Sequence, residues 1–382
     1  MTTDKEYVAY MRSRMEEKKG RTGKKAPGGQ PGRKEPVPSV RMKKKRPSLG
    51  LPGRIAAAVL ILMLVLTAAA GSVLAGALPE RYNISPQAGE GTDPAAEDYM
   101  TLALFGLDAR NGSLTEGNNR SDCIMIASIG RKSGRVRLLS VFRDTYLNIL
   151  DEVYGKANAA YSRGGPQAAV SMLNRNFDLG ITDFVSIGFL GLADVIDAMG
   201  GLDLDLTPEE VGYLNQYVDD MHKESGTCPD TLEWTQGVEH LTGIQAVAFC
   251  RIRYTTGDDY KRTSRQREVL SAMLAKVKKA GPGVWKKVFQ MVSESGVAAT
   301  SLSDGEILWL LSRGLSLEID GTKGLPDQDH RTTRMVGGQD CVIPVPLTET
   351  ASGLHRFLYD SEDYRPSETV EKISARIRDD TQ

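Results

Sequence analysis

The sequence predicts a single α/β domain, with a central sheet covered by helices, preceded by one transmembrane helix. Three observations lead to this fold class. One uncharged apolar run, residues 55–78, is long enough to cross a bilayer. Strand-like and helix-like segments then alternate from about Tyr99 onward, as in α/β folds. The 382 residues leave room for one large domain or two ordinary ones, and no internal repeat divides them.

Residues 1–54 form a basic tail with 16 Lys and Arg against 5 Asp and Glu, although the whole chain has a net charge of −1. Residues 15–50 contain almost no large apolar side chain, so they cannot build a core and are expected to be disordered. Because the tail has no helix-turn-helix pattern and no interleaved aromatic residues, we expect no nucleic acid partner. The expected contact is with anionic headgroups of the lipid bilayer.

The apolar run 55–78 predicts an uncleaved anchor rather than a signal peptide, because more than fifty largely polar residues precede it. The positive-inside rule places residues 1–54 in the cytoplasm. We therefore expect a single-pass protein of the cell membrane whose folded domain is extracytoplasmic. Residues 79–97 are interpreted as a linker, residues 98–370 as the folded domain and residues 371–382 as a C-terminal tail.

Apolar periodicity, turn residues and caps predict the elements of the domain in order. Strands are expected at residues 100–106, 122–129, 135–142, 184–188 and 202–206, with a hairpin-like turn at 130–134. Helices are expected at residues 166–177, 190–199, 241–249, 263–279 and 301–315.

Charged residues gather where the predicted strands begin or end, although burying a charge is costly unless it is paired or binds a ligand. Six of them flank the first three strands: Asp108, Arg110, Arg120, Asp122, Arg143 and Asp144. Arg251 and Arg253 alternate in a stretch predicted to be extended, so both would point the same way. The helix macrodipole opposes cations in the first turns of a helix unless an anion is bound there. The predicted 263–279 helix nevertheless has Arg262, Arg265 and Arg267 at its start. Gln266 lies on the same helix face as Arg262.

Together these residue types predict a polyphosphate site. Arg binds phosphate oxygens through two parallel hydrogen bonds, and Asp holds Mg²⁺ ions that bridge to phosphate. No P-loop and no G-x-G-x-x-G motif occurs, so a nucleotide-binding fold is not indicated. The alternative is a set of surface ion pairs, which are common and contribute little to stability.

At these residues the sequence resembles the LytR-CpsA-Psr family. The matching motifs occur in the family's order: FGLDAR (105–110), NRSDCIMIASI (119–129), LLSVFRDTY (138–146), KANAAYSRGGP (156–166), DAMGGLDLDL (197–206), LTGIQAVAFCRIR (241–253) and GDDYKRTSRQREVL (257–270). YRPSETV (364–370) resembles a C-terminal motif common in the family. The resemblance is strong over residues 98–280 and extends weakly to about 370.

The resemblance implies an α/β/α fold with a central mixed sheet and an apolar groove for a lipid tail. It also implies a membrane-anchored phosphotransferase that moves an anionic glycopolymer, such as teichoic acid or capsule polysaccharide, from a polyprenyl-pyrophosphate carrier to peptidoglycan. By motif, Asp108 and Asp122 would hold Mg²⁺, with Mn²⁺ as an alternative. The residues implied to bind the pyrophosphate are Arg120, Arg143, Arg251, Arg253, Arg262 and Gln266, supported by Arg110, Asp144, Lys156 and Arg265.

The implied reaction is attack of a sugar hydroxyl, the 6-hydroxyl of N-acetylmuramic acid in the family, on the phosphate nearer the glycan. Arg143 and Asp144 are the catalytic candidates, and Asp144 would either accept the hydroxyl proton or orient Arg143. A pyrophosphatase that uses water in place of the sugar would keep every one of these residues. The other alternative is a non-enzymatic regulator or lipid-binding module of the envelope.

The cysteines add little to this prediction. Cys123 and Cys250 lie in apolar runs and are expected to be small buried residues. An oxidising compartment permits disulfides without requiring them, and Cys228 with Cys341 is the pair to test. With no C-x-x-C motif and only four His, the chain has no zinc pattern.

Overall fold

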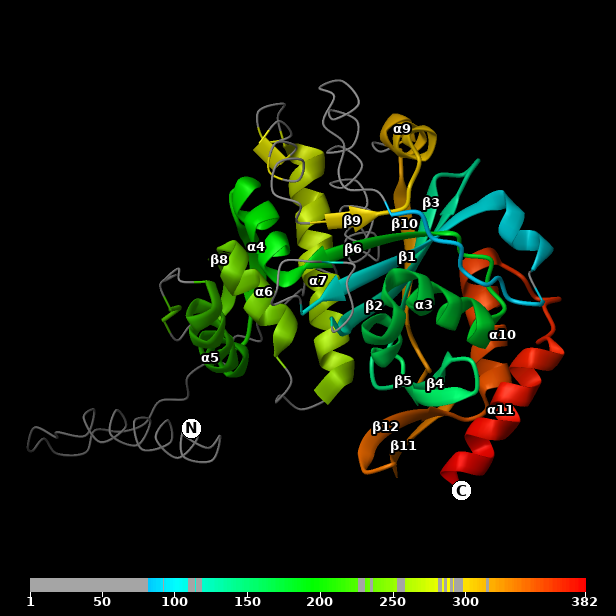
Figure 1. Ribbon diagram of the computed structural model, residues 1–382. Coiled ribbons are helices and arrows are strands. Elements are labelled where there is room, and N and C mark those ends of the chain that lie inside the picture. The colour runs from blue at the N-terminus through cyan, green and yellow to red at the C-terminus, as the bar shows by residue number, and fades with distance from the viewer. Residues whose placement is uncertain are drawn as a thin grey trace, which may run out of the picture. The chain divides into compact units, whose positions relative to one another are not determined.

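Six strands form a mixed central sheet in the order β10-β3-β2-β1-β6-β9 (Figure 1). β2 is antiparallel to both β1 and β3, β1 is parallel to β6, β3 is parallel to β10, and β9 is antiparallel to β6. The computed structural model describes residues 82–91, 93–108, 114, 119–225, 231–233, 236–252, 258–280, 284, 287–288, 291, 298–313 and 316–382. The sheet strands are β1 (Tyr99–Leu107), β2 (Ser121–Gly130), β3 (Arg135–Val141), β6 (Asp183–Gly188), β9 (Ala298–Thr300) and β10 (Glu318–Leu325).

Helices cover both faces of the sheet, which confirms the predicted α/β/α layers (Figure 1). Side chains along β1 alternate between the two cores: Leu102 and Leu104 pack on one face, Ala103 and Phe105 on the other. The first face is covered by α4 (Phe189–Ala198), α5 (Pro208–Ser225), α6 (Gly243–Arg251), α7 (Asp258–Lys279) and α9 (Asp304–Arg313). The second is covered by α3 (Ala159–Phe177), α10 (Leu347–Tyr359) and α11 (Glu368–Thr381).

Three two-stranded ribbons and one short helix complete the described part of the fold. Of the ribbon strands, only the one at 202–206 was predicted from the sequence. The ribbons are β4 (Tyr146–Leu150) with β5 (Val153–Lys156), β7 (Leu202–Leu206) with β8 (Gly237–Leu241), and β11 (Arg331–Val336) with β12 (Gln339–Pro344). The 3₁₀ helix η2 (Pro94–Asp98) leads into β1.

Several predicted helix boundaries are corrected. α7 begins at Asp258 rather than residue 263, because its first turns are polar and carry no apolar periodicity. α6 continues to Arg251, so the stretch predicted to be extended begins inside a helix. α3 begins at Ala159 and bends at Gly164 and Gly165, both with non-helical backbone angles. α9 begins with a capping box, in which Glu306 N–H donates to Ser303 Oγ at 3.3 Å and Ser303 N–H donates to Glu306 Oε2 at 2.8 Å.

The segment interpreted as a linker is docked where the structure describes it. Gln87 N–H donates to Ser171 Oγ at 3.0 Å, and Asn174 Nδ2 donates to the Gln87 carbonyl at 3.0 Å. Gly89 N–H donates to the carbonyl of Leu179 at 2.9 Å. Composition did not reveal this docking, because it depends on backbone groups finding partners more than eighty residues away.

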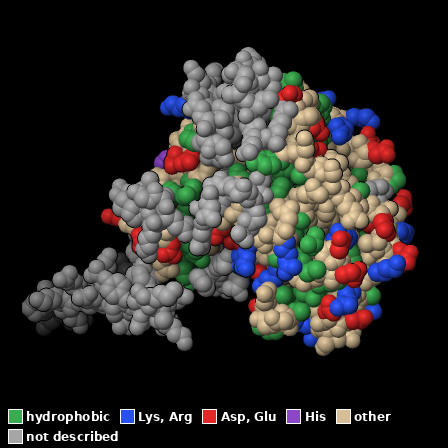
Figure 2. Space-filling model, in the orientation of Figure 1, with side chains coloured by type: hydrophobic (Ala, Val, Ile, Leu, Met, Phe, Trp, Pro, Cys, Tyr) green, Lys and Arg blue, Asp and Glu red, His purple; other side chains and the backbone are tan. Residues whose placement is uncertain are grey.

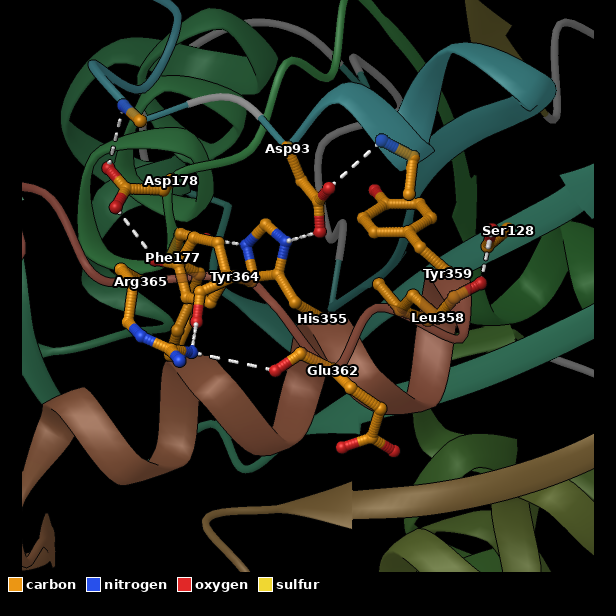
Figure 3. Close-up of polar contacts among 12 residues, drawn as sticks. Asp93, Ser128, Phe177, Asp178, His355, Leu358, Tyr359, Glu362, Tyr364 and Arg365 are labelled. Atoms are coloured by element: carbon orange, nitrogen blue, oxygen red, sulfur yellow. Dashed lines mark hydrogen bonds and ion pairs between the residues drawn. The ribbon is translucent and has the colours of Figure 1, made fainter.

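A buried polar network joins this docked segment to the C-terminal part of the chain (Figure 3). His355 contacts Asp93 Oδ2 at 3.1 Å and the Phe177 carbonyl at 2.8 Å, and its ring stacks on Tyr364. Tyr364 Oη donates to Asp178 Oδ2 at 2.7 Å. α11 follows and runs through the predicted boundary between residues 370 and 371, with Val370 and other apolar side chains in the core. On the face shown in Figure 2, basic and acidic side chains are interspersed over α11 and the β4–β5 hairpin, as on an ordinary solvated surface.

Among the described ranges, we find no helix that is both long and apolar enough to cross a bilayer. The run 55–78, predicted to do so, lies outside those ranges, as does the basic tail. Cys250 and Cys341 are buried free thiols, and Cys123 is a partly buried one. Cys228 lies outside the described residues.

Candidate active site

Three predicted charged residues meet at one end of the sheet. Because β2 is antiparallel to both β1 and β3, its first residues lie beside the last residues of those strands. Asp108 follows β1 directly, Asp122 lies at the start of β2, and Arg143 follows the end of β3. The order of the strands therefore assembles residues that are up to 35 positions apart in the sequence.

A tight turn holds Arg143 and Asp144 in place. Thr145 donates both its N–H, at 3.0 Å, and its hydroxyl, at 2.7 Å, to the carbonyl of Phe142. The N–H of Val342 on β12 donates to the carbonyl of Asp144 at 2.9 Å. Since the backbone on both sides of the pair is hydrogen-bonded, the two side chains are directed before any ligand arrives.

The side chains of this turn belong to a row of alternating charges. Arg143 Nη1 lies 2.7 Å from Asp122 Oδ1, and Arg143 Nε lies 3.3 Å from Asp144 Oδ2. Lys156 Nζ, at the end of β5, lies 2.8 Å from Asp144 Oδ1. The four side chains are only 15–21% exposed. These ion pairs are therefore less exposed than ordinary surface pairs, and removing one of the residues would leave a poorly solvated charge.

α7, which covers one face of the sheet together with α4, α5, α6 and α9, contributes Arg262 and Gln266. Both are buried and share a helix face, as predicted. However, α7 begins four residues before Arg262, so the argument from the helix N-terminus is wrong and packing, not the macrodipole, explains the position of these residues. Arg262 lies near the start of β2: burial raises the pKa of the Cys123 thiol to about 12, and the positive charge of Arg262 opposes this rise.

Arg265 has a supporting position. Its Nε donates to Glu210 Oε1 at 2.9 Å and its Nη1 donates to the carbonyl of Ile252 at 3.2 Å. Its guanidinium also lies over the ring of Phe249, 5.8 Å from the centroid. The side chain thus fixes α7 against α5 and against the end of α6, and with it the direction of Arg262 and Gln266.

Arg251 is the last residue of α6, and two aromatic rings hold it. Its guanidinium carbon lies 5.5 Å from the ring centroid of Phe189 and 5.8 Å from that of Tyr217. Arg120 is exposed just before β2, and its carbonyl accepts from the N–H of Asp108 at 3.4 Å. The two remaining predicted residues, Arg110 and Arg253, lie outside the described residues.

An apolar pocket lies next to this charged cluster. It lies between β1, β2 and β6 and the helices α4, α6 and α7, and its cavity volume is about 40 Å³. Its lining includes Gly106, Cys123, Phe189, Gln266, Val269 and Leu270. Sequence reasoning missed most of these residues, because a pocket wall of apolar side chains has the same pattern as a core. The directly preceding charged residue, Asp122 before Cys123, is the signal that could have located it.

Asp108 and Asp122 are the predicted metal ligands. Among the described residues, no group of three or more His, Cys, Asp or Glu side chains could hold a metal ion. Mg²⁺ does not require such a group, since one or two carboxylates, several waters and the phosphates of a substrate are its usual ligands in phosphoryl-transfer sites. A Mg²⁺ ion held by these two carboxylates would therefore take its remaining ligands from water and from a phosphate group.

Comparison with known proteins identifies relatives of this chain. The sequence profile of the LytR_cpsA_psr family matches residues 75–323. The "Probable cell wall biosynthesis protein LcpB" of Corynebacterium glutamicum is 30% identical over 73% of this chain and 64% of that relative. The "Polyisoprenyl-teichoic acid--peptidoglycan teichoic acid transferase TagU" of Bacillus cereus is 28% identical over 73% of this chain and 78% of that protein.

Solved structures share the fold. TagT bound to LIIa-WTA superimposes with a TM-score of 0.55 at 21% identity, covering 73% of this chain and 99% of that chain. TagT of B. subtilis gives a TM-score of 0.52 at 22% identity, covering 72% of this chain and 99% of that one. A structure of YwtF (TagT) with bound octaprenyl pyrophosphate lipid gives a TM-score of 0.51 at 21% identity, with the same coverage.

Proposed function

Because the chain belongs to the LytR_cpsA_psr family, we propose that it moves an anionic glycopolymer, such as a teichoic acid or a capsule-like polymer, from a polyprenyl-pyrophosphate carrier to peptidoglycan. The acceptor is the 6-hydroxyl of N-acetylmuramic acid, and the product is a phosphodiester. Relatives named as teichoic acid transferases and a related structure with bound octaprenyl pyrophosphate support this proposal. The match to the LcpB relative covers under two thirds of its length.

One observation carries the proposal: an apolar pocket and a cluster of cations share a boundary. Cys123 lines the pocket, and its neighbour Asp122 is hydrogen-bonded to Arg143 at 2.7 Å. Gln266 also lines the pocket, one turn beyond Arg262 on α7. A polyprenyl pyrophosphate likewise has an apolar part and a charged part, since its apolar chain is joined to two phosphates.

In this proposal Asp108 and Asp122 hold Mg²⁺, with Mn²⁺ as the alternative. The bound ion would neutralise charge on the phosphate oxygens. Arg143, Arg262 and Arg251 bind the pyrophosphate oxygens, and Gln266 donates at the border of the pocket. Arg120, Arg110 and Arg253 complete the set, and Lys156 and Arg265 hold neighbouring groups in position.

The muramic acid oxygen forms a bond to the phosphorus nearer the glycan, while the bond from that phosphorus to the bridging oxygen breaks. Polyprenyl phosphate leaves with the bridging oxygen, and the hydroxyl proton passes to a base. Positioning and charge neutralisation supply most of the catalysis in phosphoryl transfer. Both oxygens of Asp144 already pair with a cation, which favours a role in orienting Arg143 over a role as the base.

We propose that residues 55–78 anchor the protein in the cell membrane, with residues 1–54 in the cytoplasm and the folded domain outside. This topology brings the pocket to the compartment that contains peptidoglycan. It also keeps the domain near a substrate whose lipid chain lies in the bilayer.

The test uses the full-length protein in detergent with a synthetic polyprenyl-pyrophosphate-linked glycan, isolated peptidoglycan and Mg²⁺. We expect wall-linked polymer from the wild type and none from Asp108→Ala, with circular dichroism showing that the variant is folded. Full activity of Asp108→Ala would overturn the site. Release of free glycan phosphate without wall-linked polymer would instead identify the protein as a pyrophosphatase.

A further inference from the structure

Arg267 on α7 is a charged residue that the proposed function does not use. It directly follows Gln266 and extends toward β3 and β10, and its charge also acts on Cys123 at the edge of the apolar pocket. Its Nη1 donates a long hydrogen bond to Ser140 Oγ at 3.4 Å. The same atom lies close to Gly324 on β10: a Cβ atom added to this glycine would be 3.9 Å away from it. The side chain is partly buried, and within the described part of the chain it forms no ion pair with a carboxylate.

Two other arginines packed against the same sheet have carboxylate partners. Arg265, two positions earlier, pairs with Glu210 at 2.9 Å. Arg137, on β3, pairs with Asp320 at 3.1 Å and with Asp360 at 2.8 Å. Burial lowers the pKa of Arg267, even though the nearby charge of Glu268 opposes this. A partly buried cation without a paired carboxylate is expected where a ligand supplies the negative charge.

A second guanidinium lies beside the same structural feature. The guanidinium carbon of Arg331, on β11, is 5.3 Å from the ring centroid of Phe142, and its Nη1 donates to the carbonyl of Pro326 at 3.1 Å. The ring of Phe142 packs directly on Gly324, where an added Cβ would lie 2.9 Å from Cζ. Arg267 and Arg331 therefore both border the residue that immediately precedes Arg143.

The apolar pocket, the Asp122–Arg143 pair and Arg267 follow one another across the strands of the sheet. The apolar pocket lies over β6, β1 and β2, the pair of Asp122 and Arg143 lies at the ends of β2 and β3, and Arg267 lies over β3 and β10. A donor whose lipid chain fills the pocket and whose pyrophosphate contacts Arg143 continues along the sheet toward β10, where the partly buried Arg267 and Arg331 lie. At that position a donor of the proposed class carries its glycan.

We propose that Arg267 and Arg331 form a subsite for an anionic group of the donor glycan, beyond the pyrophosphate. A phosphate fits best, because guanidinium groups bind phosphate oxygens in pairs. The inference rests on the proposed function and deepens it, since it assigns the residues that select an anionic polymer over a neutral one.

The test compares two synthetic donors with the same polyprenyl pyrophosphate and disaccharide, of which only one carries glycerol phosphate units. With full-length protein, we expect Arg267→Gln to lower kcat/KM for the phosphate-bearing donor by about tenfold or more, mainly through KM. Transfer from the neutral donor should stay within about twofold, because it makes no contact with this subsite. Arg331→Gln should act in the same direction, and Arg267→Lys should recover part of the loss.

The matched control is Arg334→Gln, an exposed arginine on the same strand whose position in β11 points to the opposite face from Arg331. This variant should not change kcat/KM for transfer from either donor. An equal loss on both donors would overturn the proposal, as would no loss on either. A loss that depends on free carboxylates in the peptidoglycan peptides would assign the subsite to the acceptor instead.

Binding of the two donors without acceptor, measured by thermophoresis in detergent, keeps the subsite testable if the wild type transfers neither. Selective weakening of the phosphate-bearing donor in Arg267→Gln would then support the subsite while the proposed transfer fails. Equal affinity of the variant and the wild type for that donor would overturn the subsite independently of any activity.

Discussion

Two clusters of charged residues lie at opposite ends of the central sheet, and their surroundings differ. At the far end, Asp178 accepts hydrogen bonds from Tyr364 Oη, from the N–H of Ser367 and from its hydroxyl, each at 2.7 Å. Gly91 N–H donates to the same carboxylate at 3.3 Å. The residue is 1% exposed, so a single carboxylate is fully enclosed by donors of the protein.

At the site end, the charged groups face one another and remain within reach of solvent. Asp122, Arg143, Asp144 and Lys156 keep 15–21% of their side-chain surface exposed. The pocket beside them is open, and Arg267 nearby forms no ion pair among the described residues. The comparison teaches that burial alone does not identify a functional charge. What separates the two ends is whether the protein itself supplies all the partners.

The largest expected effect is on activity at the site end. Arg143→Ala should lower transfer by about a thousandfold, because it removes a fixed donor from the position where phosphate charge develops. The measurement is the rate of wall-linked polymer formation. Arg356→Ala is the control, since this arginine is 57% exposed and pairs with the exposed Glu362. Activity of Arg143→Ala within tenfold of the wild type would remove it from the site.

The next effect is on stability at the far end. Asp178→Asn should lower the free energy of unfolding by about 3 kcal/mol, because an amide cannot accept from all the donors around it. Asn keeps the left-handed backbone that Asp178 adopts at φ 50°, so the change tests the hydrogen bonds and not the turn.

The control for Asp178→Asn is Asp98→Asn, a 70% exposed carboxylate near the same end that pairs with Lys132. It should change the urea unfolding midpoint very little. If Asp178→Asn were as stable as the wild type but inactive, the contrast between a structural end and a functional end would not hold.

The sequence predicted the parts of this comparison that depend on local pattern. The strand expected at 135–142 is β3, and the pair Arg143-Asp144 lies where that strand ends, as the abrupt change from apolar to charged residues indicated. The assembly of Asp122 with Arg143 followed from two neighbouring strands and a short turn. Residues in such positions are constrained by the sheet, so their proximity can be inferred without coordinates.

The rest depends on contacts that no local pattern records. The docking of Gln87 on α3 joins residues 84 positions apart, and the stacking of His355 on Tyr364 fixes a network that reaches back to Asp93. Arg251 was expected in an extended stretch, because the apolar run before it does not reveal where α6 ends. Arg267 looked like its neighbours in sequence, and only the absence of a paired carboxylate in the described structure distinguishes it.

A smaller effect is expected from filling the pocket. Cys123→Phe should raise KM for the lipid-linked donor about tenfold while kcat changes little, because the larger ring occupies space meant for the lipid chain. Cys123→Ser is the matched control, since it replaces the same sulfur without adding volume. If the two variants had equal KM and kcat, the pocket would not bind the lipid chain of the donor. Circular dichroism would show whether Cys123→Phe still folds.

The smallest effect concerns the chemistry of the same thiol. Burial raises the pKa of Cys123 to about 12 from an ordinary value of 9.0, despite the nearby charges of Arg262 and Arg267. The folded protein should therefore resist alkylation at Cys123 at pH 8, whereas the urea-unfolded chain should react, since only the thiolate is nucleophilic.

The same shift has a defined sign for stability. The protonated thiol is favoured in the folded state, so its contribution is complete below the ordinary pKa and is lost as the pH rises from there toward 12. Cys123→Ser should flatten that alkaline loss in urea titrations followed from pH 8 to pH 10. Rapid alkylation of native Cys123 at pH 8, measured by mass spectrometry, would show that the thiol is exposed to water. Cys123 would then not mark the border between the apolar pocket and the charged residues beside it.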